Sequence, residues 1–264
     1  ELRLPIWSSD CSLNNQELVF KIHSDYVRAG ADIITTNTFR TTSYTYHKAG
    51  FSKQNAFERA RDSLFFATDL ALKASDGKKV AGSITTIDDC YLPNKFPGKK
   101  ITEQVYQELM TWFKETDVDF ILFETMGNMK EISIALDQAK NFNYKIWLSI
   151  IIKNSKYLLD GTSLVSFFNK IKKYDISCLL INCNCMENTL DSIKSINKHW
   201  KSAWGCYPNL GKKELINDYF EIIDEKLFLD NIKSIVSKKP SVIGACCGST
   251  PYHVKLINEI LKDR

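Results

Sequence analysis

The feature of this 264-residue sequence that most constrains its fold is a regular alternation of short apolar runs with longer segments of helical periodicity. Most of the runs are continuously apolar, which indicates strands that are covered on both faces. Such strands form parallel sheets whose connections are helices. The candidate strands are residues 31–37, 79–85, 120–126, 145–152, 178–185, 203–209 and 242–247.

The segments between these runs have the spacing of amphipathic helices. Ala56, Ala60 and Leu64, for example, recur at helical intervals with charged residues between them. Before the last segment, Thr250 can cap a helix and Pro251 suits its first turn, where a missing N–H costs little. Each segment is long enough to cross back between two parallel strands.

This alternation runs without a break in composition, so we expect one α/β domain over residues 1–264. The number of units suits a (β/α)8 TIM barrel or a large doubly wound sheet. We favour the barrel, because the sequence has neither of the glycine-rich motifs that bind phosphate in open nucleotide-binding sheets. Only seven strands are predicted and residues 1–11 contain none, so the expected barrel has its first strand missing or truncated.

Charge and composition exclude several classes of partner. The 35 basic and 31 acidic residues leave a net charge of +4 with no long run of one sign, so no nucleic-acid partner is expected. No apolar stretch approaches the roughly 18 residues of a membrane-spanning helix, and the first residues lack the segments of a secretory signal. We therefore expect a cytoplasmic protein with no membrane partner, whose eight cysteines are reduced thiols, some of which could hold a metal.

Chemically reactive side chains gather at the predicted ends of the strands. In a barrel, the C-terminal ends of the strands form the active site. Here those ends include Glu124, Cys185 and the adjacent pair Cys246 and Cys247. Three thiolates select zinc and leave a fourth tetrahedral position for water or substrate, as catalytic sites do. Buried structural thiols are the alternative interpretation of the same residues.

Motifs in a common order run through nearly the whole chain. Residues 243–251 read I-G-A-C-C-G-S-T-P, residues 182–185 read N-C-N-C, and residues 123–128 read F-E-T-M-G-N. They resemble the G-G-C-C-G/R-x-x-P, G-[IV]-N-C and F-E-T-[IM]-P-N motifs of the homocysteine S-methyltransferase family. The double-cysteine motif is the most specific, and further matches lie at residues 4–8, 29–36 and 207–209.

The resemblance implies a (β/α)8 barrel in which three cysteines hold Zn²⁺ and the sulfur of homocysteine completes the tetrahedron. Carried over to this chain, the ligands are Cys185, Cys246 and Cys247. Cys183 competes with Cys185 for the first position.

We prefer Cys185 because Asn184-Cys185 then follows the apolar strand as N-C does in the family. Asn182 would take the place of the family's glycine, which is tolerable because Asn is among the residues that accept a positive φ. Cys183 would then be a thiol that faces the core.

The resemblance also implies residues for the substrate. Glu124 would bind the amino group of homocysteine, and the alternative is a buried charge paired with an Arg or Lys. Asn184 is a further candidate for substrate binding. Thr36, Asn37 and Asn209 could either line the pocket or satisfy backbone groups at turns of the barrel.

Two other groups of residues are expected to take no part in chemistry. Asp88 and Asp89 follow the strand at residues 79–85, and we interpret them as part of a solvated loop. The four histidines fall in predicted helices or loops, and a metal-activated thiol needs no general base.

The expected function is zinc-dependent transfer of a methyl group from a small donor to the homocysteine thiolate, which gives methionine. The chain is compact, so S-methylmethionine or S-adenosylmethionine is preferred to betaine as the donor. One alternative is a catalytically degenerate barrel that binds zinc or an amino-acid thiol, because the family's D-G-G-x-x-T-E-L segment has no counterpart beyond Glu1-Leu2. Another is a barrel hydrolase that uses Glu124, but no second carboxylate at a strand end supports it.

Overall fold

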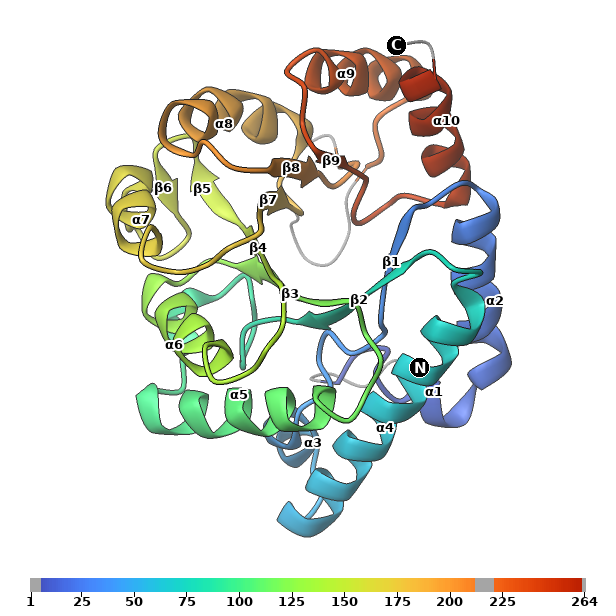
Figure 1. The fold of residues 1–264 in the computed structure, drawn as a ribbon, viewed down its shortest axis with the longest axis vertical. Coiled ribbons are helices and arrows are strands. Elements are labelled where there is room, and N and C mark those ends of the chain that lie inside the picture. Colours follow the sequence, from blue (N-terminus) through green and yellow to red (C-terminus); the bar gives the residue numbers. More distant parts are fainter. Residues whose placement is uncertain (1–5, 212–220, 263–264) are drawn as a thin grey trace.

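The centre of the molecule is a curled parallel sheet, seen in a computed structural model that describes residues 6–211 and 221–262. Its seven strands follow the order β1-β2-β3-β4-β7-β8-β9 (Figure 1). Every pairing between neighbours in this sheet is parallel. The strands are β1 (Ile33–Thr35), β2 (Lys79–Ile84), β3 (Phe120–Met126), β4 (Ile146–Ile150), β7 (Cys178–Asn182), β8 (Trp204–Tyr207) and β9 (Val242–Ile243).

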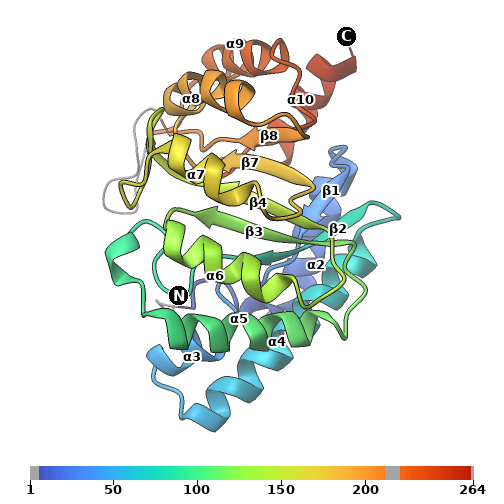
Figure 2. The same cartoon turned by 60° about the vertical axis from the view of Figure 1, so that its left-hand side comes forward.

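Helices surround this sheet, as the two ribbon views show (Figures 1 and 2). A short antiparallel hairpin of β5 (Ile152–Asn154) and β6 (Tyr157–Leu158) follows β4, and Pro93–Lys95 forms one turn of 3-10 helix. None of the described helices is both long and apolar enough to cross a membrane. The α-helices are α1 (Cys11–Asn14), α2 (Gln16–Arg28), α3 (Ser43–Lys48), α4 (Lys53–Ala74), α5 (Lys99–Phe113), α6 (Met129–Ala139), α7 (Leu164–Ile171), α8 (Met186–His199), α9 (Glu225–Val236) and α10 (Pro251–Lys262).

The predicted α/β barrel-type fold is confirmed, with each predicted strand present but several of them shorter. The run at residues 178–185 stops at Asn182 because Cys183 has a φ of 55°, which no regular strand allows. The run at residues 242–247 stays in the sheet only as far as Ile243. In both places the chain leaves the sheet just where the cysteines occur.

Within the described residues, β1 and β9 are the edges of the sheet and no strand lies between them. The first and last helical units are joined instead through α2 and α10. Asn258 of α10 donates hydrogen bonds to the carbonyl oxygens of Ala29 (3.1 Å) and Gly30 (2.8 Å), and Tyr26 of α2 donates to that of Ser249 (3.3 Å). Gly30 has a φ of 97°, and a Cβ there would lie 2.3 Å from the Asn258 amide nitrogen, so only glycine fits.

Side chains inside the curl of the sheet form a small apolar core of their own. Ala81, Phe120, Leu122, Cys178 and Leu180 make up this cluster, separate from the larger core under the helices. Because side chains alternate between the two faces of a strand, the next inward positions toward the C-terminal ends are Ser83, Glu124 and Asn182. Polar side chains therefore lie next to this small apolar core, on the side of the C-terminal ends of the strands.

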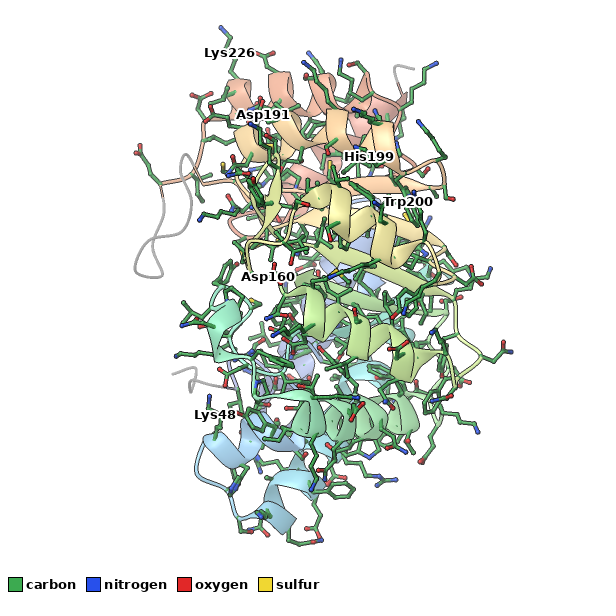
Figure 3. The ribbon with its side chains drawn as sticks, turned by 90° about the vertical axis from the view of Figure 1, so that its left-hand side faces the viewer. Lys48, Asp160, Asp191, His199, Trp200 and Lys226 are labelled. Atoms are coloured by element: carbon green, nitrogen blue, oxygen red, sulfur yellow. The ribbon has the colours of Figure 1, made fainter. Side chains whose placement is uncertain are left out.

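Figure 3 shows the side chains on one side of the molecule, Asp160 among them. Asp160, which follows β6, accepts a 2.7 Å hydrogen bond from the backbone N–H of Met129 at the start of α6. The carboxylate satisfies one of the free N–H groups in the first turn of that helix. The hairpin region is thereby tied to the helix that follows β3.

Candidate metal centre and substrate site

Three thiols from two distant parts of the chain meet at the C-terminal edge of the sheet. The sulfur atoms of Cys183, Cys246 and Cys247 all lie within 4.8 Å of one another. The Sγ of Cys247 is 3.4 Å from that of Cys183 and 4.0 Å from that of Cys246. Sulfurs about 2.3 Å from a tetrahedral zinc ion would be about 3.8 Å apart, so these three residues fit such an ion.

The backbone around these thiols is held by the segment that follows β8. The N–H of Cys183 donates to the carbonyl of Tyr207 (3.1 Å), and Asn209 donates its amide to the carbonyl of Cys183 (2.9 Å). On the other side, the N–H of Cys246 donates to the carbonyl of Pro208 (2.7 Å). One short segment therefore fixes both halves of the cluster.

This geometry favours Cys183, the competing candidate, over Cys185, which we preferred as the first ligand. Cys185 is buried at the N-cap of α8 and lies outside the group of three thiols. The positive φ falls on Cys183, one residue after Asn182, where we expected it, and the thiol in the cluster lies two residues before Cys185. The sequence holds a signal for this register, because Ile181-Asn182-Cys183 keeps an apolar residue before N-C, as the family motif does.

Hydrogen bonding among the thiols favours a charged sulfur at the open end of the cluster. Cys247 is exposed, whereas Cys183 is buried. Hydrogen bonds from Cys183 and Cys246 lower the pKa of Cys247 to about 3, and hydrogen bonds with Cys183 and Cys247 raise the pKa of Cys246. Cysteine binds a metal as the thiolate, so the lowered pKa of Cys247 favours the form of this residue that metal binding requires.

Glu124 is the carboxylate of the site. Of the residues of β3, it alone keeps partial exposure. Its Oε2 accepts a 2.7 Å hydrogen bond from the hydroxyl of Ser83, and burial raises its pKa. No salt bridge within the described residues reaches Glu124, so the structure gives it no Arg or Lys partner. The carboxylate remains available to a cationic group.

Two of the predicted polar residues lie near the end of β1 and bond within the protein. Thr36 is buried, shares a 2.6 Å hydrogen bond with the hydroxyl of Thr38, and accepts from the N–H of Ser83 at 3.1 Å. Asn37 donates its amide to the carbonyl of Ser8 (2.9 Å). Thr36 therefore supports the residue that holds Glu124, and Asn37 anchors the segment before α1. That segment carries the motif at residues 4–8, whose first two residues lie outside the described chain.

The other two predicted residues satisfy backbone groups. The amide of Asn184 accepts from the N–H of Ile152 (3.0 Å) and donates to its carbonyl (2.8 Å). Asn209 accepts from the N–H of Gly211 (3.0 Å), in addition to its bond to Cys183. Both of these bonds of Asn209 go to backbone groups, the second of the two roles that we considered for it.

The loop after β2 is packed and not solvated, which corrects our interpretation of Asp88. Its side chain is 10% exposed and forms a 2.6 Å ion pair with Lys48 of α3. Glu131 of α6 accepts from the N–H of Ile87 (2.7 Å) on the other side of the loop. The loop brings the hydroxyl of Tyr91 to 3.0 Å from the sulfur of Cys183, a contact with the thiol cluster that the sequence did not indicate.

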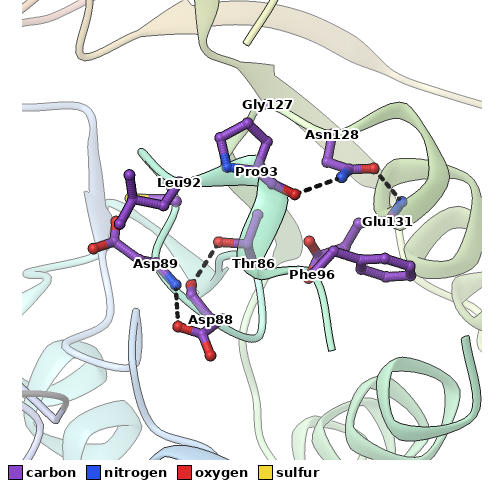
Figure 4. Close-up of a pocket in the computed structure, with 10 residues that line it drawn as sticks. Thr86, Asp88, Asp89, Leu92, Pro93, Phe96, Gly127, Asn128 and Glu131 are labelled. Atoms are coloured by element: carbon purple, nitrogen blue, oxygen red, sulfur yellow. Dashed lines mark hydrogen bonds between the residues drawn. The ribbon is translucent and has the colours of Figure 1, made fainter. Parts of the chain in front are cut away.

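A small cavity lies beneath this loop (Figure 4). It is lined by residues such as Thr86, Asn128 and Glu131, and its volume of about 10 Å³ has room for roughly one water molecule. Asn128 bridges its two sides, donating to the carbonyl of Pro93 (3.0 Å) and accepting from the N–H of Lys130 (2.9 Å). The cavity is too small to hold an amino acid, so it is not the substrate site.

The curled parallel sheet, with three thiols and a carboxylate at the C-terminal ends of its strands, defines a (β/α)-barrel protein with a candidate metal centre. The sequence profile of the family described as homocysteine S-methyltransferase matches residues 1–261. The chain belongs to the homocysteine S-methyltransferase family, and is an enzyme of that family.

Individual relatives agree with this assignment. Homocysteine S-methyltransferase 3 of Zea mays is 26% identical over 292 residues, which cover 99% of this chain and 85% of that protein. A selenocysteine Se-methyltransferase of Brassica oleracea var. italica is 24% identical, covering 100% and 85%. Crystal structures of the homocysteine methyltransferase MmuM from Escherichia coli share the fold at 21% identity. Its oxidized form matches with a TM-score of 0.84 over 98% of this chain and 89% of that one, and its metallated form with 0.83 over 97% and 90%.

Proposed function

We propose that the protein binds one Zn²⁺ through Cys183, Cys246 and Cys247 and methylates the thiol of homocysteine to give methionine. The observation that carries this proposal is the meeting of the three thiols on the side of the sheet where Glu124 also faces inward. Zinc, when bound, supplies a Lewis acid that favours loss of the proton from a thiol at its fourth position. No side chain need then act as a general base.

The chain's own residues bind and orient the acceptor. Glu124 has a carboxylate without a cationic partner among the described residues, so the ammonium group of an amino acid is a suitable ligand for it. Ser83 fixes this carboxylate, and Tyr91 contacts Cys183 at the other end of the site. An acceptor held at both its ammonium group and its sulfur has little freedom to turn, and positioning is the main demand of an in-line displacement.

The proposed donor is a sulfonium compound, S-methylmethionine or S-adenosylmethionine. In the reaction, a new bond forms between the acceptor sulfur and the methyl carbon while the methyl–sulfonium bond breaks. The electron pair of that bond leaves with the donor sulfur, which becomes a neutral thioether. The thiol proton passes to solvent, so the charges balance without any oxidant or reductant.

Metal analysis of the purified protein tests the site. We expect about one zinc per chain, lost in Cys247→Ser and retained in Cys206→Ser, where the replaced thiol is buried in the larger core away from the cluster. A metal-free wild type that cannot be loaded with zinc would refute the proposed centre.

A panel of donors tests the reaction. Methionine formation from homocysteine is measured with S-methylmethionine, S-adenosylmethionine and betaine, and selenocysteine serves as a second acceptor. We expect turnover with a sulfonium donor. Turnover with betaine alone would contradict the proposed donor class, and zinc binding without any turnover would favour the alternative of a degenerate binding module.

A further inference from the structure

Tyr207, the last residue of β8, has a buried hydroxyl near the side chains of Glu124 and Ser149. Its Oη is buried and has no hydrogen-bond partner within the described part of the chain. A buried polar group without a partner costs about 1–3 kcal/mol, so native proteins rarely keep one unless it has a ligand or a function. Among residues 6–211 and 221–262 this is one of only four such side-chain atoms.

The position of this hydroxyl relates it to the substrate site. Tyr207 pairs with Asn182 across β7 and β8, and its ring packs against the small core inside the curl of the sheet. Both Glu124 and Cys246 lie near enough to contribute to a raised pKa of the phenol, for which burial is the largest cause. The hydroxyl therefore faces the space between the carboxylate and the thiol cluster, and it stays protonated at neutral pH.

Resting on the proposed function, we infer that the oxygen of Tyr207 accepts a hydrogen bond from the α-ammonium group of the amino-acid substrate, beside Glu124. An ammonium group has three N–H donors, and a carboxylate alone leaves some of them without a partner. The neutral phenol adds a second acceptor. Substrate binding then satisfies a group that has no partner in the free protein.

The test is a comparison of two acceptors that differ only in the amino group. Homocysteine and 4-mercaptobutyrate carry the same thiol chain and carboxylate, but the second lacks the ammonium group. Binding of each to the zinc-loaded wild type and to Tyr207→Phe is measured by calorimetry. We expect Tyr207→Phe to weaken homocysteine binding about tenfold, the loss that one such hydrogen bond gives, and to leave 4-mercaptobutyrate binding unchanged.

Three further measurements test whether the loss is specific to the contact between Tyr207 and the ammonium group. Zinc content of Tyr207→Phe should equal that of wild type, because the hydroxyl is not a proposed ligand. Tyr46→Phe removes another buried hydroxyl without a partner, in α3, and should not affect the binding of either acceptor. Methyl transfer should show the same loss as a rise in KM for homocysteine, with kcat little changed.

The outcomes separate this inference from the proposed function. Equal weakening of both acceptors, or unchanged homocysteine binding with a gain in stability, would show that the hydroxyl has no contact with the ammonium group. If wild type binds homocysteine but transfers no methyl group, the proposed reaction is wrong and the binding comparison still decides the role of Tyr207. If loaded wild type binds no homocysteine, both ideas are wrong.

Discussion

The side-chain amide of Asn182, in β7, forms two hydrogen bonds with Thr125 of β3, although β4 lies between these strands in the sheet. Its Oδ1 accepts from the N–H of Thr125 at 3.1 Å, and its Nδ2 donates to the hydroxyl of Thr125 at 2.8 Å. Thr125 directly follows Glu124 and has a φ of 58°, while Cys183 directly follows Asn182 and has a φ of 55°. Left-handed backbone is unfavourable for both residue types, so surrounding contacts must hold it. One amide thus sets the carboxylate and the first thiol relative to each other.

We therefore predict strong coupling between Asn182 and Thr125. Asn182→Ala should lower the free energy of unfolding by about 2–3 kcal/mol, because it leaves a buried N–H without an acceptor. Thr125→Val removes only the hydroxyl and should cost about 1–2 kcal/mol. Denaturant unfolding of the two single variants and the double variant gives the interaction energy. Strictly additive losses would contradict a direct link between the residues.

The choice between Cys183 and Cys185 is a second prediction. Both thiols are buried and two residues apart, so they are a matched pair. Cys183→Ser should reduce zinc content from about one per chain to a small fraction, because its sulfur lies in the group of three. Cys185→Ser should keep the metal. The opposite pattern, measured by metal analysis, would restore our first assignment.

A third prediction concerns Gly205 in β8. It pairs with Val242 of β9, the strand that leads to Cys246 and Cys247. A Cβ on residue 205 would lie 2.1 Å from the backbone carbonyl oxygen of Val242, so the two strands would have to separate. Gly205→Ala should lower stability by about 2 kcal/mol or more and weaken zinc binding.

Gly50→Ala is the control for this substitution. Gly50 has a φ of 99°, and no atom of the described residues lies within 4 Å of the position that a Cβ would take there. The strain of its backbone should cost about 1 kcal/mol and leave zinc content unchanged. Thermal unfolding and metal analysis check both variants. A smaller loss in Gly205→Ala than in Gly50→Ala would contradict the close contact between β8 and β9.

The buried carboxyl of Glu131 predicts a dependence of stability on pH. Burial raises its pKa from an ordinary value of 4.5 to about 7, so the folded protein holds this proton more tightly than the unfolded chain. Its contribution to stability is therefore complete below about pH 4.5 and is lost as the pH rises through 7. Gln at this position stays neutral throughout.

Glu131→Gln should consequently gain stability relative to wild type as the pH rises from 5 to 8. Thermal unfolding at several pH values measures this difference. A constant difference between Glu131→Gln and wild type across this range would show that Glu131 titrates alike in both states.

Much of the fold could be predicted because it depends on local pattern. Continuous apolar runs such as residues 120–126 must be covered on both faces, and the intervening amphipathic segments provide the cover. The seven parallel strands follow from this pattern, as does the placement of Glu124 and the adjacent cysteines near strand ends. Where the runs end was less clear, because the positive φ at Cys183 depends on contacts made far along the chain.

By itself, the sequence determined the class of fold, the family and the kind of chemistry, since apolar periodicity and a few motifs encode them. Only the tertiary structure decided that Cys183 joins the vicinal pair and that the hydroxyl of Tyr207 is buried near Glu124. The physical reason is that an amide or hydroxyl can bond to many partners. Which partner it takes depends on strands brought together from distant parts of the chain.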